Sequence, residues 1–356
     1  MNRICHSSFG TLEAVLNLAN FNGEGHRRLV HFTRLRATGE WTPLTVISET
    51  PKSGGSIIQN VSKPYAKAEH GDFEVLVLEQ NGAVRHYTRD NSDADNDFCW
   101  RLSGTVNTIS DSGRPNTQAI EAAPLVQTQT SMSPLMDGTC LETAILEEGG
   151  SMVHYRRPQY RGSGALVAEY MTEWYRGTTI VQGATGPACL YQPDRETLMA
   201  LVPTLSGIKR YRHHERSNSW MSIGILAGKS GPGFVYSITT PSGPVLRAIY
   251  RDGYHIDEKV CNEPNWDDTF EGVLPASFNH IRDTLYHRVY RTVPISIASQ
   301  SMSGLGDSSN AEAIVFHASG TGYQDAWMVL HWSLPAGHDE WVVSSVVVPN
   351  VIGMPI

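Results

Sequence analysis

The sequence has little charge and few cysteines. Of its 356 residues, 18% are Asp, Glu, Lys or Arg, and the formal net charge is -8. A protein that binds a phosphate backbone needs a basic surface, so nucleic acid is not an expected partner. The cysteines are odd in number and far apart, as is usual in a reducing compartment and unusual for a disulfide scaffold. They are Cys5, Cys99, Cys140, Cys189 and Cys261.

Long apolar runs are absent as well. No stretch approaches the roughly 18 apolar residues that a membrane span needs. The first ten residues, MNRICHSSFG, lack the apolar core of a secretion signal. We therefore expect a cytoplasmic chain without a membrane span.

The motifs of several common catalytic sites are missing. No C-x-x-C or H-E-x-x-H pair occurs, so we expect no metal site. The G-K-S at 228–230 lacks the earlier glycine of a phosphate loop, and the G-x-S-x-G elbow of serine hydrolases does not occur. None of the tryptophans completes the S-x-D-x-G-x-x-W hairpin of sialidase propellers. We expect neither a metal nor an organic cofactor.

What the sequence does contain is an internal repeat built on a His-aromatic pair. Its copies are LVHFTR at 29–34, VRHYTR at 84–89, MVHYRR at 152–157, IKRYRH at 208–213, the weaker GYHID at 253–257, and VLHWS at 329–333. A tryptophan follows each copy: Trp41, Trp100, Trp174, Trp220, Trp266 and Trp341. Six units are therefore expected.

Two further runs precede each pair and resemble strands bounded by turns. The longer run lies at 11–18, 73–79, 141–147, 197–203, 245–251 and 311–317, and the shorter at 56–60, 124–128, 188–192, 233–237 and 294–298. Four strands in each of six units predict an all-β, six-bladed β-propeller that forms a single domain over residues 1–356. The first unit lacks the shorter run, so we expect residues 349–356 to pair with N-terminal strands and close the ring.

A glutamate recurs at the start of the longer run in four units. These residues are Glu13, Glu74, Glu142 and Glu312, and we align Leu198 and Val245 with them in the other two units. A repeated glutamate could bind a sugar in each unit or tie neighbouring strands together. We interpret the His-aromatic pairs as structural, because a residue that occurs once per blade usually packs one sheet against the next.

Positions that differ between units are the candidate ligand site. Alignment of the innermost strands places Gln59, Gln127, Tyr191, Tyr236 and Ile297 at equivalent positions, with Gln129, Gln192 and Gln300 nearby. Amides, phenols and apolar groups around a channel suit a small, largely apolar ligand with a few oxygens. The alternative is that these side chains hydrogen-bond one another or ordered water.

The stretch GDFEVLVLEQNGAVRHYTRDNSD at 71–93 resembles the blade repeat of fucose-specific-lectin-like propellers, and weaker copies cover nearly the whole chain. That group includes fungal proteins identified as hetero-Diels-Alderases, which join a tropolone quinone methide to a macrocyclic sesquiterpene such as humulene. The chain is similar to them in size and in its degenerate blades. The resemblance implies a cofactor-independent pericyclase of fungal secondary metabolism, and it transfers no catalytic motif.

Two functions therefore remain open. A lectin repeats its sugar ligands from blade to blade, and here they do not recur cleanly, which favours one asymmetric pocket. In an enzyme, Tyr191, Tyr236, Gln127 and Gln59 would act on the tropolone oxygens, and a Tyr or His would relay a proton. Gln129, Gln192, Ile297 and Gln300 would bind the substrates. The oligomeric state, a homodimer included, is open.

Overall fold

The computed structural model describes most of the β-structure of the chain. The described residues are 4–19, 26–35, 37–60, 71–91, 99–107, 118–122, 125–130, 138–159, 173–194, 197–228, 233–240, 243–252, 255–261, 271–275, 292–299, 311–319, 326–335 and 341–352. Within them the structure is almost entirely β-strand, and one short 3-10 helix, η3 (Glu215–Ser217), follows β16.

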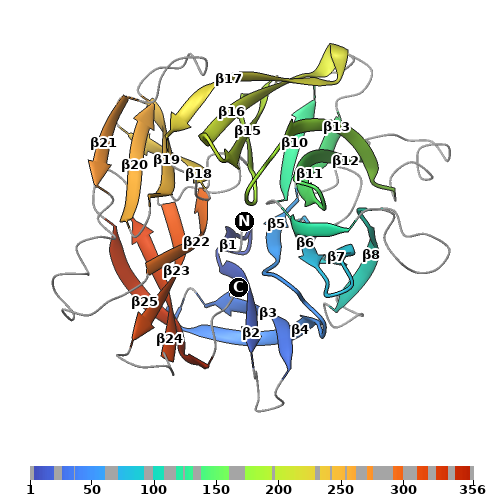
Figure 1. Ribbon diagram of the computed structural model, residues 1–356. Coiled ribbons are helices and arrows are strands. Elements are labelled where there is room, and N and C mark those ends of the chain that lie inside the picture. The colour runs from blue at the N-terminus through green and yellow to red at the C-terminus, as the bar shows by residue number, and fades with distance from the viewer. Residues whose placement is uncertain are drawn as a thin grey trace. The chain divides into compact units, whose positions relative to one another are not determined.

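The strands form six antiparallel sheets, five of which have four strands in chain order. Figure 1 labels most of these strands. Three of the sheets are β1 (Ile4–His6), β2 (Leu12–Ala19), β3 (Arg27–Arg34) and β4 (Trp41–Ser48); β5 (Ser56–Gln59), β6 (Phe73–Leu78), β7 (Val84–Arg89) and β8 (Trp100–Thr105); and β14 (Cys189–Asp194), β15 (Thr197–Thr204), β16 (Gly207–His214) and β17 (Ser219–Ala227).

Two more four-stranded sheets come from the C-terminal part of the chain. They are β18 (Gly233–Thr240), β19 (Gly243–Asp252), β20 (His255–Cys261) and β21 (Glu271–Pro275); and β22 (Thr292–Ser299), β23 (Ala311–Ser319), β24 (Ala326–Leu334) and β25 (Val342–Ile352). The remaining sheet has β10 (Val126–Thr130), β11 (Gly138–Glu147), β12 (Ser151–Gln159) and β13 (Tyr175–Gln182), and β9 (Ala119–Ala122) also pairs with β11. The expectation of four strands in every unit is wrong for this five-stranded sheet.

The chain divides into two compact units of three sheets each. One unit spans residues 56–232 and contains the sheets β5–β8, β9–β13 and β14–β17; the other combines residues 2–55 with 233–356 and contains β18–β21, β22–β25 and β1–β4. Within each unit, successive antiparallel sheets pack against one another. This is how the blades of a β-propeller are organised, so the expected propeller arrangement of antiparallel sheets is confirmed.

Burial follows the position of a strand in its sheet. Every residue of β6 (FEVLVL) and of β15 (TLMALVPT) is buried, because both faces of these inner strands pack against other side chains. The last strand of a sheet is largely exposed, as β4 and β17 show. Apolar runs with little polar alternation therefore predicted the central strands.

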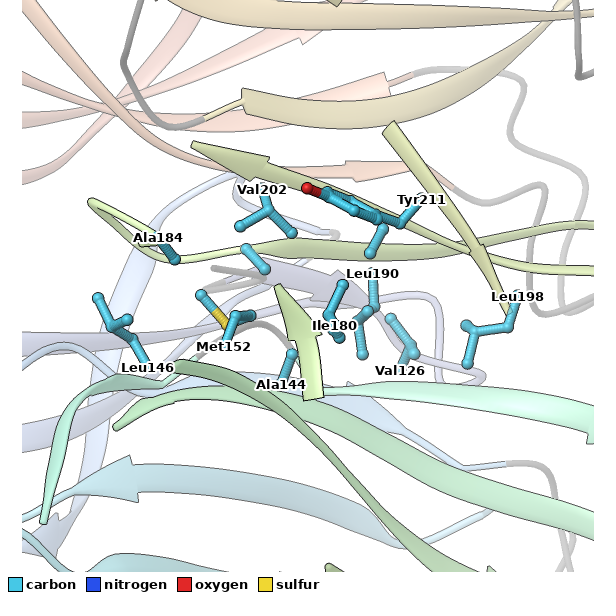
Figure 2. Packing of buried hydrophobic residues seen from close by; sticks show 12 residues of the cluster. Val126, Ala144, Leu146, Met152, Ile180, Ala184, Leu190, Leu198, Val202 and Tyr211 are labelled. Atoms are coloured by element: carbon cyan, nitrogen blue, oxygen red, sulfur yellow. The ribbon is translucent and has the colours of Figure 1, made fainter. Parts of the chain in front are cut away.

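Apolar side chains fill the space between successive sheets. In residues 56–232, Ala144 and Met152 of one sheet pack with Leu190 and Val202 of the next (Figure 2). In the other unit, Leu16 and Val30 share a cluster with Ile314 and Val347.

The N-terminal sheet corrects the expected ring closure. Its innermost strand is β1, which pairs with β2, whereas the C-terminal strand β25 pairs with β24. Residues 349–352 therefore extend the last sheet, and residues 353–356 lie outside the described part. The three-residue strand Ile4–His6 is too short to show a β pattern in the sequence.

Candidate functional site

Four of the six sheets contain a buried glutamate on the second strand beside a buried histidine on the third. The carboxylate and imidazole atoms are 2.9 Å apart in Glu13–His31, and 2.7 Å apart in Glu74–His86, Glu142–His154 and Glu312–His331. In each sheet the glutamate lies opposite the residue two positions after the histidine. The recurring glutamate and the recurring histidine of the sequence thus form one structural element.

The residue two positions after the histidine also faces the carboxylate as a donor. Thr33 donates to Glu13 at 3.0 Å, Thr88 to Glu74 at 2.7 Å and Ser333 to Glu312, while the Arg156 guanidinium lies 3.8 Å from Glu142. In the sequence, this position varies among Thr, Arg and Ser from unit to unit, which suggests that the repeat has lost its pattern there. The structure shows that all three types satisfy the same buried charge.

In two of the pairs, these surroundings lower the pKa of the buried carboxylate, that of Glu74 and that of Glu142. Burial by itself would raise the pKa of Glu74, but His86 and the Thr88 hydroxyl outweigh it, so the pKa lies below its ordinary value. Burial opposes ionisation of Glu142 in the same way, and His154 and Arg156 lower its pKa overall.

The other two sheets carry different residues at the two positions. In β16, the repeat IKRYRH places Arg210 at the histidine position, so Arg212 is the residue two positions later. Arg212 pairs with Met199 of β15, which therefore stands at the glutamate position. In β19, we align Arg247 with the glutamate because Ala248 follows it, as Ala14 follows Glu13 and Ala313 follows Glu312. Glu258, opposite Ile249, then stands at the histidine position. The alignment of Leu198 and Val245 with the glutamates is therefore wrong by one and two residues, respectively. His255 begins β20 opposite Asp252 and is not an equivalent of the buried histidines.

A tryptophan of the next sheet packs edge-on against three of the histidines. The ring centroids are 5.5 Å apart for His86–Trp174, 5.3 Å for His154–Trp220 and 5.5 Å for His331–Trp41, with interplanar angles of 85°, 87° and 75°. Each tryptophan lies within one residue of the start of the outer strand of the adjacent sheet. The prediction that the His-aromatic repeat packs one sheet against the next is confirmed for these three contacts.

The fourth residue of the His-aromatic motif adds a second contact between sheets. Arg157 Nη1 lies 2.7 Å from His86 Nδ1, and because a guanidinium only donates, the imidazole proton is on Nε2, facing Glu74. Its equivalent in β16 is His213, whose ring centroid lies 5.2 Å from that of His154. Burial, followed by His154, lowers the pKa of His213 to about 4, so the His213 imidazole is neutral at pH 7.

Two of the predicted site residues hydrogen-bond within their own sheets. The Gln59 amide donates to the Gly71 carbonyl at 2.9 Å, and Gln127 donates to the Gln159 side chain at 2.9 Å. Gly71 closes tightly on the end of β5, because a Cβ there would lie 1.8 Å from the Asn60 carbonyl oxygen. Gln59 is buried, whereas Gln127 is half-buried.

Strand register separates the predicted set into two groups. Gln59 and Gln127 lie opposite the residue before the glutamate, but Tyr191 lies opposite Met199 at the glutamate position itself. Tyr191 is therefore one position out of register with the two glutamines, and the half-buried Gln192 is their counterpart in sequence. Equivalence of Tyr191 with Gln59 and Gln127 is a wrong expectation, caused by the absence of a pattern in runs of four or five residues.

The remaining predicted residues are described only in part. Tyr236 pairs with Arg247 and Ile297 with Ala313 along the backbone, and Gln129 pairs with Thr139. Their side chains, and Gln300 altogether, lie outside the described residues. Sequence reasoning missed Arg157, and the signal that could have found it is its place three residues after a buried histidine.

The described part of the chain holds neither a candidate metal cluster nor a candidate membrane-spanning helix. Within the described ranges, no three His, Cys, Asp or Glu side chains gather as a metal site would require. No helix in this part of the chain has the length and apolar character to span a membrane.

Two solved structures have a fold similar to that of this chain. AofleA from Arthrobotrys oligospora is 10% identical, with 98% of this chain and 87% of that chain covered and a TM-score of 0.56. The SapL1 lectin in complex with alpha methyl fucoside is 11% identical, with coverage of 98% and 95% and a TM-score of 0.53. At such identities the likeness shows the fold alone. No protein-family model matches the chain, and no curated protein does.

Proposed function

We propose that this chain is a pericyclase, a hetero-Diels-Alderase that joins a tropolone o-quinone methide to a macrocyclic sesquiterpene such as humulene. One observation carries the preference for a single-ligand protein over a multivalent one. The repeated polar residues are buried and bonded to each other, since the four histidines are at most 1% exposed and their glutamates at most 7%. The choice of substrates rests on the sequence resemblance.

We also propose how the sheets are assembled and where in the cell the protein acts. The six sheets would close into one six-bladed ring and act as a single domain, with the ligand at its innermost strands. The chain would work in the cytoplasm, without metal or organic cofactor. Its partners would be small, largely apolar molecules.

Residues of the innermost strands would carry the chemistry. A hydroxymethyl tropolone loses water to give the quinone methide, and Tyr191 or Tyr236 relays the proton to the leaving hydroxyl. Amide donors at Gln127 and Gln59 would bond the tropolone oxygens, which draws electron density from the heterodiene. Gln129, Gln192, Ile297 and Gln300 would hold the polyene against one face, and this orientation sets the rate and the stereochemistry.

Chiral chromatography of hydroxymethyl tropolone incubated with humulene tests this function. We expect a single-enantiomer adduct that forms faster than the racemic background. Tyr191→Phe and Gln127→Leu should lower the rate or the enantiomeric excess, whereas Leu205→Ser, a change at an exposed turn, should leave both intact. Background-level racemic product with wild-type protein would refute the cyclase.

A fucose- or glycan-binding lectin is the second candidate. It is favoured by the fold shared with SapL1, a lectin solved with alpha methyl fucoside. Titration of alpha methyl fucoside into the protein that failed the cyclase assay would decide this alternative.

A further inference from the structure

The Glu312–His331 pair differs from the other three pairs because a serine hydroxyl completes it. Ser345 of β25 lies opposite His331, and its Oγ is 3.3 Å from His331 Nδ1. On the other side of the ring, His331 Nε2 is 2.7 Å from Glu312 Oε2. Carboxylate, imidazole and hydroxyl thus follow one another in the order of a nucleophilic triad.

The polarity of these contacts suits proton transfer from the serine. Trp41 Nε1–H donates to Ser345 Oγ at 3.2 Å. An indole nitrogen only donates, so the hydroxyl is left to donate its own proton to His331 Nδ1. The imidazole proton then lies on Nε2, where Glu312 accepts it.

The same register position lacks this hydroxyl contact in the other sheets whose side chains are described there. Glycine occupies it in three of them: Gly104 opposite His86, Gly224 opposite Arg210, and Gly177 beside His154. Thr45 lies opposite His31, but its hydroxyl donates to the Val46 carbonyl at 3.4 Å. The packing role of the Glu–His pair therefore does not require a hydroxyl at Ser345.

Access favours Ser345 as well. His331 is fully buried and Glu312 nearly so, whereas Ser345 is half-buried on the outermost strand of its sheet. Its neighbours Val343 and Val346 are 44% and 46% exposed. A small acyl group, and later the water that releases it, can reach the hydroxyl from solvent at this half-buried position.

We propose that Ser345, His331 and Glu312 form an acyl-transfer site for small activated esters, separate from the cyclase site. Ser345 Oγ forms a bond to the acyl carbon while its proton passes to His331 Nδ1. The alkoxide of the ester leaves and takes that proton. Water then attacks the acyl carbon and gives a proton to His331 Nδ1. The bond between the acyl carbon and Ser345 Oγ breaks, His331 returns the proton to Oγ, and the acid leaves, so Ser345 is restored. Glu312 is a positioning residue that holds the imidazole and its tautomer.

The test is covalent labelling of the full chain with a small alkyl fluorophosphonate, followed by intact mass and peptide mapping. Attack on phosphorus expels fluoride, so we expect one phosphonyl group per chain, on Ser345. Ser345→Ala and Ser345→Gly, the latter copying Gly104 and Gly224, should abolish the adduct. Thr45→Ala and Ser222→Ala should retain it, because the Thr45 hydroxyl donates to the Val46 carbonyl and Ser222 lies opposite Tyr211.

The positioning role of Glu312 has its own readout. Glu312→Gln should slow labelling roughly a hundredfold, the order of a general-base contribution, and Glu312→Asp should restore part of it. The pH profile of labelling should also change in Glu312→Gln. Among the described residues, His6 is a further titratable group that interacts with both Glu312 and His331. An absent adduct, an adduct that persists in both Ser345 variants, or wild-type labelling in Glu312→Gln would overturn the proposal.

Discussion

At the scale of single residues, a buried carboxylate is stable only while its partners are present. In Glu74, the carboxylate is surrounded by His86, the Thr88 hydroxyl and the Asn60 amide, whose nitrogen lies 2.8 Å from it. If the carboxylate or one of its partners is removed, the remaining polar groups stay buried without that partner. The resulting loss in the free energy of unfolding exceeds the net contribution of the interaction itself.

Glu74→Ala should therefore lower the free energy of unfolding by about 3 kcal/mol. The double variant Glu74→Leu with His86→Leu should recover part of this loss, because no imidazole is left facing an empty carboxylate position and the leucines refill the volume. Urea denaturation of the three proteins measures the difference. A double variant that is less stable than Glu74→Ala would contradict this account.

Burial of His213 makes the free energy of unfolding depend on pH. His213 has a pKa of about 4 in the folded protein, against an ordinary value of 6.5. The unfolded chain therefore binds a proton at this residue first, and stability falls as pH decreases from about 6.5 to about 4. His154, Glu142 and Arg156 are the charged or titratable groups that act on this ring.

His213→Gln should remove about 2 kcal/mol of the loss in stability between pH 7 and pH 4, a value discounted for partial solvation. The measurement is the melting temperature across this range. His214→Gln is the matched control, because His214 is the exposed neighbour on the same strand. Equal pH dependence in wild type and His213→Gln would exclude this residue as the cause.

At the scale of elements, the tryptophan near the start of an outer strand packs against a histidine of the preceding sheet and so holds the two sheets together. Trp174 packs edge-on against His86, and its Nε1 lies 3.4 Å from His86 Nδ1. Trp174→Ala should destabilise the protein by about 3 kcal/mol, and Trp174→Phe by about 1 kcal/mol, since phenylalanine keeps the aromatic packing and loses the donor. Tyr175→Ala, at the exposed next residue, is the control in thermal unfolding.

The presence of a strand could be predicted from the sequence where its residues form a long apolar run or recur from unit to unit. The apolar runs of β6 and β15 and the His-aromatic strands β3, β7, β12 and β24 stand where the pattern placed them. The strand β1, with three residues, and β9, with four, are too short to be recognised. The site was harder still, because a shift of one residue between Tyr191 and Gln127 reverses the face of the strand and nothing local in the sequence reveals it.

At the scale of the whole molecule, the number of ligands bound per chain separates the two proposed functions. Four sheets bury the repeated glutamate against a histidine, and the β14–β17 and β18–β21 sheets lack it, with Met199 and Arg247 at its position. No set of equivalent polar ligands therefore recurs at this position in all six sheets, as a multivalent binder would need.

We expect one molecule of the tropolone–humulene cycloadduct to bind per chain in isothermal titration calorimetry. The stoichiometry follows from the asymmetry of the innermost strands: the register position that Gln59 and Gln127 share is occupied by His6 in β1 and by Ser299 in β22. Alpha methyl fucoside is the contrasting titrant. If it bound at several equivalent sites in each chain, the blades would be functionally alike, and the degeneracy of their buried positions would concern packing rather than ligand choice.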